Sequence, residues 1–408
     1  MNQSINANRL FLASCFALIT TALSFSIRAG ILSQLGTEYG FTAAQLGTIN
    51  SMWFLGFPLS MVVGGLVYNS VGPQKIMQFA FFAHAVGILL TIYSGGNYSL
   101  LLISTLLIGL GNGCTEAACN PMIADSYDGI KMSEMLNKFH MWFPGGIVLG
   151  ALISKFMTDA GTSWQAQIWV IMIPTLIYAF LFWGQAFPKP KAVEATSLSD
   201  NLKAMANPLF IFIFIFMALT SISEFGPQSW VGVILSKSGA DPMLLLAITT
   251  GTMAVIRFFA GPIVKALQHE GVLLGSAILA TIGLFLLSSQ TGTIAYASAF
   301  VYACGIGLFW PNMLGIVADK VPATGAIGMS LIGAIGMFSS SIFQPIIGQW
   351  IDTAKANAEA QGLTGDALEL AAGQEALSTM VLFPGICILG FIGLYFWMKS
   401  SKKEKVLA

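Results

Sequence analysis

Four charged side chains lie inside the long apolar stretches of this sequence: Arg28, Glu116, Glu224 and Arg257. The 408 residues include 18 basic and 18 acidic side chains, so almost all of the charge lies outside those stretches. A charge near the centre of a bilayer costs about 2.5 to 3.5 kcal/mol on insertion scales, and four would cost roughly 10 to 14 kcal/mol without compensation. We therefore expect these side chains to face a water-accessible cavity inside a membrane, where a secondary transporter binds its solute.

Proton coupling is the chemistry that the carboxylates suggest. Glu116 precedes the polar turn at Asp125 by nine residues, or about 13 Å of helix rise, which places it well inside the hydrocarbon region. A carboxyl group there can change its protonation when water, solute or the guanidinium of Arg28 approaches. We expect Glu116, Glu224 and Arg28 to carry proton coupling. The alternatives are a Glu116 that only fastens its helix to a neighbour and a permanent ion pair between Arg28 and Glu116.

Solute binding is the second chemistry. Arg28 offers five donors in a planar fork, which suit a carboxylate or vicinal hydroxyls, so it would anchor an acidic solute and regulate Glu116 for a neutral one. Sugar sites also pair aromatic faces with amide groups. The further candidates, each with ordinary packing as its alternative, are Asn50, Trp53, Glu116, Asn120, Asn137, His140, Glu224, Gln228, Trp310, Asn312 and Gln344. We expect His84 to be a packing residue and His269 to lie in a solvated loop.

Membrane-spanning helices must position these residues. Hydrophobic residues make up 56% of the chain and charged residues 9%. In soluble domains, apolar residues make up about 45 to 50% and charged residues about 25%. Apolar runs of about 20 residues recur throughout, which suits helices crossing a bilayer and disfavours a barrel of short strands. We expect an all-α membrane protein with twelve spans at 10–35, 45–69, 75–94, 98–124, 137–158, 165–186, 207–236, 242–266, 271–289, 293–319, 323–351 and 376–398.

The spans divide six and six. We expect a six-helix bundle at 1–186, a polar cytoplasmic linker at 187–206 and a second six-helix bundle at 207–408. Basic residues are retained on the cytoplasmic side. Thirteen Lys and Arg residues lie on the side that holds both termini, and three lie on the opposite side. The sequence therefore predicts a multi-pass protein of the cell (inner) membrane with both termini cytoplasmic.

The two halves resemble each other. A shift of 196 residues pairs Arg28 with Glu224 and Gly30 with Gly226, and a shift of 194 pairs glycines at 111 and 113 with those at 305 and 307. This pattern favours a duplication. Parallel repeats of this kind predict two pseudo-symmetric bundles with the solute site between them near the membrane midplane.

The segment after the second span resembles the cytoplasmic signature of the major facilitator superfamily. Gly65, Asn69, Gly72 and Lys75 occupy its positions, with Asn69 where the family usually has Asp, and a weaker copy runs from Arg257 to Gly261. The resemblance covers essentially the full length and implies the major facilitator fold. It also implies that these six residues take part in conformational gating.

Two groups of that superfamily are resembled more specifically. The stretch from Gly111 to Pro121, with Glu116 followed by Ala and by Asn-Pro, is similar to the fourth helix of fucose/proton symporters, as are Asn137 to His140 and Glu224. Arg28 in Ser-Ile-Arg-Ala-Gly resembles instead the anion/cation symporters of sugar acids, in which an Arg in helix one and a Glu in helix four belong to the site.

These observations predict proton-coupled symport of a sugar or sugar derivative by alternating access. The alternatives are an organic-anion or sugar-acid transporter, coupled to protons or sodium, with Arg28 on the carboxylate, and a membrane receptor. The sequence holds no hydrolase nucleophile motif or clustered Cys and His, so we expect no enzyme, catalytic residue, cofactor or metal site. The expected partners are a small-molecule solute, H+ and the lipid bilayer, without nucleic acid, and the expected state is a monomer.

Overall fold

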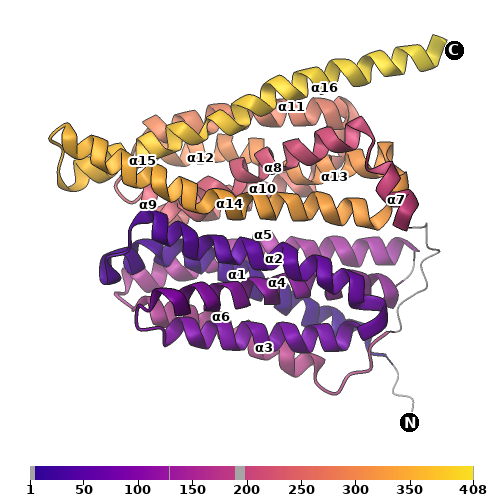
Figure 1. The fold of residues 1–408 in the computed structure, drawn as a ribbon, viewed down its shortest axis with the longest axis horizontal. Helices are drawn as coiled ribbons and strands as arrows, with labels where there is room; N and C mark the ends of the chain where they lie inside the picture. Colours follow the sequence, from indigo (N-terminus) through magenta and orange to yellow (C-terminus); the bar gives the residue numbers. More distant parts are fainter. Residues whose placement is uncertain (1–4, 128, 189–197, 408) are drawn as a thin grey trace. The chain divides into compact units, whose positions relative to one another are not determined.

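A computed structural model describes residues 5–127, 129–188 and 198–407, and these residues form helices joined by short turns (Figure 1). The chain divides into two compact units. The first comprises Met1–Glu194 with Gln344–Gly348, and the second comprises Ala195–Phe343 with Gln349–Ala408. The expected linker at 187–206 falls partly on residues 189–197, which lie outside the described residues.

The first unit contains six long helices. Their bounds are α1 Ala7–Tyr39, α2 Ala43–Val71, α3 Pro73–Ile92, α4 Tyr98–Ser126, α5 Gly129–Asp159 and α6 Trp164–Phe182. The turn between α1 and α2 follows directly from the sequence. Gly40 ends α1 with φ 68°, a left-handed conformation that glycine adopts without steric cost. Thr42 and Gln45 then form a capping box that starts α2.

The second unit contains the remaining helices of the described chain, apart from the Gln344–Gly348 stretch of α14, which groups with the first unit. They are α7 Leu198–Ala204, α8 Pro208–Ser229, α9 Val231–Ile234, α10 Pro242–Phe258, α11 Ala260–Ser289, α12 Thr293–Ile306, α13 Phe309–Lys320, α14 Gly325–Ala360, α15 Gly365–Met380 and α16 Leu382–Leu407. A short 3-10 turn at Pro322–Thr324 separates α13 from α14.

The two units repeat one packing pattern. In the first, α4 packs on α2 and α3, and α6 packs on α1 and α3. In the second, α12 packs on α10 and α11, and α16 packs on α8 and α11. The pairs match in order along the chain, which confirms the predicted pseudo-symmetric bundles.

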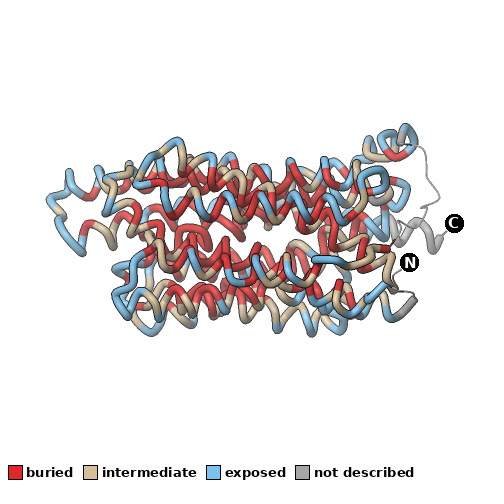
Figure 2. The backbone as a smooth tube through the Cα atoms, turned by 90° about the horizontal axis from the view of Figure 1, so that it is seen from below, coloured by how far each residue is buried: buried red, intermediate tan, exposed pale blue. Residues whose placement is uncertain are grey.

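Eleven helical stretches of the described chain are long and apolar enough to cross a membrane. The twelfth expected span corresponds to α10, whose 17 residues lie at the lower end of the range that spans about 30 Å of hydrocarbon. Buried and exposed residues alternate along the helices of both units (Figure 2). The chain is therefore a multi-pass all-α membrane protein, as predicted.

Prolines interrupt the helices of two of the expected spans. Proline cannot donate to the carbonyl four residues earlier, and its ring clashes with that carbonyl. The span expected at 242–266 ends at Phe258, four residues before Pro262. The span expected at 293–319 is present as one apolar stretch, Thr293–Lys320, with an interruption at Gly307 and Leu308 between α12 and α13, directly before the turn that contains Pro311.

Two further expectations about local structure are corrected. The span expected at 207–236 is also divided, because α8 ends at Ser229 and α9 starts at Val231. The turn expected between the spans at 45–69 and 75–94 is shorter than predicted, because α2 runs to Val71 and α3 starts at Pro73, which leaves only Gly72 with φ 83° between them.

Candidate functional site

Arg28 lies at the centre of a buried cluster in the first unit, formed with Asn50 and Trp53 of α2. The residue is 6% exposed. Its Nε donates a hydrogen bond to Asn50 Oδ1, and its guanidinium carbon lies 5.0 Å from the centre of the Trp53 ring, a cation–π geometry. Arg28 Nη2 is buried and has no hydrogen-bond partner among the described residues. The Arg28 cluster, meaning Arg28, Asn50 and Trp53, therefore presents one unused cationic donor.

Aromatic packing and one hydroxyl fix the Trp53 ring. The ring lies 4.9 to 5.7 Å from the rings of Phe25, Phe54 and Phe57, and its Nε1 donates to Ser24 Oγ at 2.9 Å. Trp53 is fully buried. The aromatic face that Arg28 packs on is therefore held in place from several sides.

Glu116 and Asn120 form a second polar pair in the same unit, one turn apart on α4. Asn120 Nδ2 donates to Glu116 Oε2 at 2.6 Å and to the Glu116 carbonyl at 3.0 Å. The Glu116 side chain is half-buried. Among the described side chains no ion pair joins Arg28 to Glu116, so the alternative in which these two residues form a permanent helix tether is wrong.

In the second unit, Glu224 of α8 pairs with Arg257 of α10. Arg257 Nη2 lies 3.5 Å from Glu224 Oε1, and Glu224 is 4% exposed. Arg257 Nε donates to the Gly307 carbonyl at 2.8 Å. That carbonyl is available because Pro311, four residues on, has no N–H to donate to it. Arg257, expected to act in gating, thus contacts an acidic candidate of the second unit directly.

A second proline-freed carbonyl lies beside Glu224. Pro227 leaves the carbonyl of Ser223 without its helical donor, and Tyr302 of α12 donates its hydroxyl to this oxygen at 2.6 Å. The same hydroxyl lies 3.2 Å from the Glu224 carbonyl. Two prolines therefore create the backbone acceptors that hold Tyr302 and Arg257 around Glu224.

The other candidates of the second unit lie in separate contacts. Gln228 Nε2 lies 3.6 Å from Met253 Sδ, and the half-buried Trp310 packs edge-on against Phe225 at 6.3 Å. Trp230, next to α9, has a buried Nε1 that lacks a hydrogen-bond partner among the described residues.

Asn312 is bonded within α13 and to α11. Its Nδ2 donates to the Leu308 carbonyl at 2.7 Å, and its Oδ1 lies 2.8 Å from His269 Nδ1. His269 Nε2 lies 3.3 Å from Asp319. His269 follows directly on a kink at Gln268 (φ 58°) within α11, so the expected break in the helix is present there, but the ring is half-buried against α13 rather than free in solvent.

Of the three remaining candidates, one bonds the Arg28 cluster and two lie apart from the clusters. Gln344 lies in the stretch of α14 that groups with the first unit, and its Oε1 accepts from Asn50 Nδ2 of the Arg28 cluster at 2.9 Å. Asn137 and His140 are exposed on α5. No hydrogen bond joins His140 to Glu116 among the described residues.

The gating candidates lie within the last two turns of α2 and α10, in the first turns of α3 and α11, or in the turn at Gly72. Asn69 and Lys75 are exposed on either side of the Gly72 turn. Gly65 of α2 and Gly261 of α11 have open space where a Cβ would be. Their role in a transport cycle stays a prediction.

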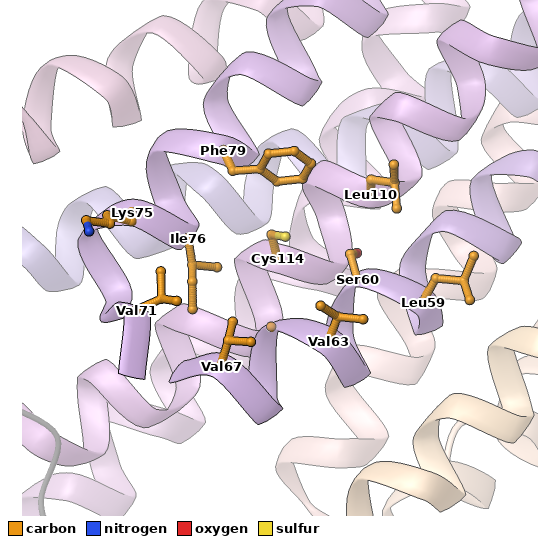
Figure 3. Close-up of a pocket in the computed structure, with 11 residues that line it drawn as sticks. Leu59, Ser60, Val63, Val67, Val71, Lys75, Ile76, Phe79, Leu110 and Cys114 are labelled. Carbon is orange, nitrogen blue, oxygen red and sulfur yellow. The ribbon is translucent and has the colours of Figure 1, made fainter. Parts of the chain in front are cut away.

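A cavity of about 360 Å³ lies on α2, α3 and α4 (Figure 3). Its lining is apolar apart from Ser60, Lys75 and the Cys114 thiol, and it includes no member of the Arg28 cluster. A cavity with so few polar groups is a poor site for a hydroxylated or charged solute. We therefore base the candidate site on the buried polar clusters.

Sequence reasoning missed two of the residues that build these clusters, Ser24 and Tyr302. His84, expected to be a packing residue, is fully buried between Tyr178 and Asn112. The signal was weak, because Ser, Tyr and single His residues occur widely in helix packing. Among the described residues no group of three or more His, Cys, Asp or Glu is arranged to hold a metal ion.

Comparisons with known proteins agree with this architecture. A family model described as Major Facilitator Superfamily matches residues 14–345. The "Sphingosine-1-phosphate transporter SPNS2" of Danio rerio is 23% identical over 323 residues, which span 69% of this chain and 63% of that protein. The "Inner membrane metabolite transport protein YgcS" of Escherichia coli (strain K12) is 20% identical over 415 residues, covering 92% of this chain and 87% of that protein.

A solved structure shares the fold. It is a bacterial homologue of the human lysosomal transporter Spinster, with TM-score 0.78 and 15% sequence identity, covering 95% of this chain and 97% of that chain. These related proteins are transporters rather than enzymes.

Proposed function

The chain belongs to the Major Facilitator Superfamily, and from that premise we propose that it is a proton-coupled symporter of a sugar acid or related organic anion. Arg28 binds the solute carboxylate in this proposal. The proposed cycle is alternating access, in which the solute site opens to one side of the membrane at a time. The proposed location is the inner membrane with both termini cytoplasmic, supported by the distribution of Lys and Arg.

The observation that carries the proposal is the unbalanced charge of Arg28. The guanidinium is buried, its described contacts are an amide and an aromatic face, and Nη2 has no described hydrogen-bond partner. A buried cation without a paired anion is costly. A solute carboxylate supplies the missing charge, and guanidinium–carboxylate pairs often form two parallel hydrogen bonds.

Glu116 is the proposed proton-coupling residue. It is half-buried, and among the described residues no Lys or Arg forms an ion pair with it. Its described partner is the neutral amide of Asn120. A carboxyl group without a fixed cation can exist in either protonation state as its surroundings change. Glu224, in contrast, already has Arg257 within 3.5 Å.

A neutral sugar is the second candidate solute. Several uncharged buried groups lack described hydrogen-bond partners, namely Asn120 Oδ1, Ser221 Oγ, Trp230 Nε1 and Ser340 Oγ. Such groups suit hydroxyls rather than a charge. A sodium-coupled cycle would use the same carboxylate in another way, and a receptor would bind the solute without accumulating it.

Uptake into proteoliposomes tests the proposal. Purified protein is first screened by thermal shift against D-glucuronate, D-galacturonate, D-glucose and D-galactose, because a bound solute raises the melting temperature. Radiolabelled uptake is then measured under an inward proton gradient, with a sodium gradient for comparison. We expect accumulation of a uronate under the proton gradient.

Two variants with matched controls locate the roles. Arg28→Lys keeps the charge but loses the planar fork, so we expect KM for the acid to rise about 10-fold or more, equal to about 1.4 kcal/mol. Arg9→Lys is its control, because Arg9 bonds the carbonyls of Leu181 and Phe180. Glu116→Gln should abolish proton-driven accumulation and retain counterflow exchange, with the exposed Glu134→Gln as control.

Three results would contradict the proposal. Uptake of neutral sugars with an unchanged KM in Arg28→Lys selects the second candidate. Accumulation under a sodium gradient alone would show that sodium, and not the proton, is the coupling ion. Solute binding without accumulation under either gradient indicates a receptor.

A further inference from the structure

A chain of side-chain hydrogen bonds crosses the first unit and ends at the Arg28 cluster. His84 of α3 is fully buried. Its Nδ1 lies 2.9 Å from the Tyr178 hydroxyl of α6, and its Nε2 lies 2.9 Å from Asn112 Oδ1 of α4. Asn112 Nδ2 donates to Ser24 Oγ at 3.3 Å, and that oxygen also accepts from Trp53 Nε1 at 2.9 Å. The bonds connect five helices.

The direction of each bond in this chain follows from Ser24. Its hydroxyl proton goes to the Thr21 carbonyl at 2.7 Å, so Ser24 Oγ can only accept from Asn112 and Trp53. Asn112 must then present its NH₂ group to Ser24 and its oxygen to His84. His84 Nε2 therefore carries the proton, and the Tyr178 hydroxyl donates to Nδ1. Each donor in this chain of hydrogen bonds therefore faces an acceptor.

The sequence leaves room for the His84 ring at one glycine. A Cβ at Gly111 of α4 would lie 2.6 Å from His84 Nε2, closer than van der Waals contact allows. Without a side chain there, the imidazole edge reaches Asn112, the next residue on α4. The ring is thus fitted between α3 and α4 in one orientation.

We propose that His84 is a positioning residue for the solute site. As the Nε2–H tautomer it orients Asn112, which together with Trp53 bonds Ser24, and this fixes the Trp53 ring against the guanidinium of Arg28. Arg28 Nη2 is then held toward the solute rather than toward the protein. The consequence for transport rests on the proposed function, whereas the consequence for the tautomer and for the Trp53 ring does not.

A matched control exists on the same pair of helices. Thr91 of α3 donates to Ser104 Oγ of α4 at 2.9 Å, and both residues are buried. This bond joins α3 to α4 as His84 does, but the described hydrogen bonds of Thr91 and Ser104 do not lead to Trp53. Thr91→Val therefore removes a comparable interhelical bond without touching the chain that ends at Arg28.

Nuclear magnetic resonance on the full-length protein tests the positions directly. The chain has 3 His and 9 Trp residues, so ¹⁵N-histidine and indole signals are assignable with His84→Gln and Trp53→Phe. We expect ¹⁵N shifts of His84 that identify the Nε2–H tautomer. We also expect His84→Leu to shift the Trp53 indole signal and speed its hydrogen exchange at least 10-fold. His84→Gln, which keeps a donor near Nε2, and Thr91→Val should leave that signal close to wild type.

Transport kinetics give the second measurement, with D-glucuronate as the probe. His84→Leu should raise KM about 10-fold while the maximal rate changes less, because the loss is in solute binding. His84→Gln should stay within about 3-fold of wild-type KM on the same scale.

The outcomes separate the two proposals. A Nδ1–H tautomer, an unchanged Trp53 signal in His84→Leu, or an equal change in Thr91→Val would overturn the positioning role. Absence of any D-glucuronate transport by wild type contradicts the proposed function alone, because the resonance data still decide the role of His84. If His84→Leu does not fold, the wild-type tautomer and the His84→Gln spectrum decide it.

Discussion

Pro311→Ala perturbs the position of Arg257 without touching Arg257 itself. In the native chain Pro311 leaves the Gly307 carbonyl free, and Arg257 Nε donates to it at 2.8 Å. Alanine restores an N–H that can donate to the same oxygen as an ordinary helical bond. We expect α12 and α13 to join across Gly307 and Leu308, and Arg257 to lose this bond and move from Glu224.

The substitution has two opposing effects on stability and a separate effect on function. Proline in a helix interior costs about 3 kcal/mol relative to alanine, and less in the first turn of a helix, where Pro311 stands in α13. The lost charge-assisted hydrogen bond is worth about 1.5 to 3 kcal/mol. Because the two roughly cancel, the free energy of unfolding should change little. Glu224, however, loses the cation that now lies 3.5 Å from it, so a transport step that depends on this pair should be impaired.

The assay measures both quantities on one preparation. We expect the melting temperature of Pro311→Ala to stay within a few degrees of wild type while the initial rate of proton-driven uptake falls at least 10-fold. Pro174→Ala in α6 is the control, because this proline also lies inside a helix and no arginine is bonded to the carbonyl that it frees among the described residues. Wild-type uptake in Pro311→Ala, or an equal loss in Pro174→Ala, would refute the reasoning.

Two other substitutions test how the backbone is held. Tyr302→Phe removes the hydroxyl that donates to the proline-freed carbonyl of Ser223 at 2.6 Å. The buried carbonyl is then left unpaired at a cost of about 1 to 3 kcal/mol, so chemical unfolding should show a lower free energy of unfolding. An unchanged denaturation midpoint would contradict this expectation. Gly72→Ala forces a side chain into a φ of 83° at a cost of about 1 to 2 kcal/mol, so its melting temperature should fall. Gly65→Ala is the control, because Gly65 lies in an open, helical position where alanine should be neutral or stabilising. A lower melting temperature for both variants would count against the explanation.

Much of the fold could be predicted because it depends on apolar run length. Each run of about 20 apolar residues in the sequence forms a helix in the structure, and α10 is shorter than the others. The breaks in those helices could be predicted only in part. A proline in the sequence marks a freed carbonyl four residues earlier, but it does not say that Arg257 would reach Gly307 or that Tyr302 would reach Ser223. Those partners are 50 and 79 residues apart, and only tertiary packing brings them together.

The candidate site shows the same division. Arg28, Asn50 and Trp53 were predictable as solute-binding candidates because polar groups in apolar spans need compensation, and the structure brings these three together. His84 was expected to be a packing residue and is fully buried, but its partners could not be predicted, since Asn112 and Tyr178 lie 28 and 94 residues away. A single histidine in an apolar helix gives no hint of such partners, so its pattern suggested packing.

The repeat relates the two embedded charges that matter most, and it reverses their sign. A shift of 196 residues pairs Arg28 of α1 with Glu224 of α8, and these helices hold matching places in their units, on α6 and α16. Glu224 is balanced inside its own unit by Arg257, whereas among the described residues Arg28 contacts only neutral groups. The duplicated scaffold therefore keeps one neutral pair and one unbalanced cation. Because an unbalanced buried cation is costly, a solute that brings a negative charge gains most by binding at Arg28, which is why we propose an anion as the solute.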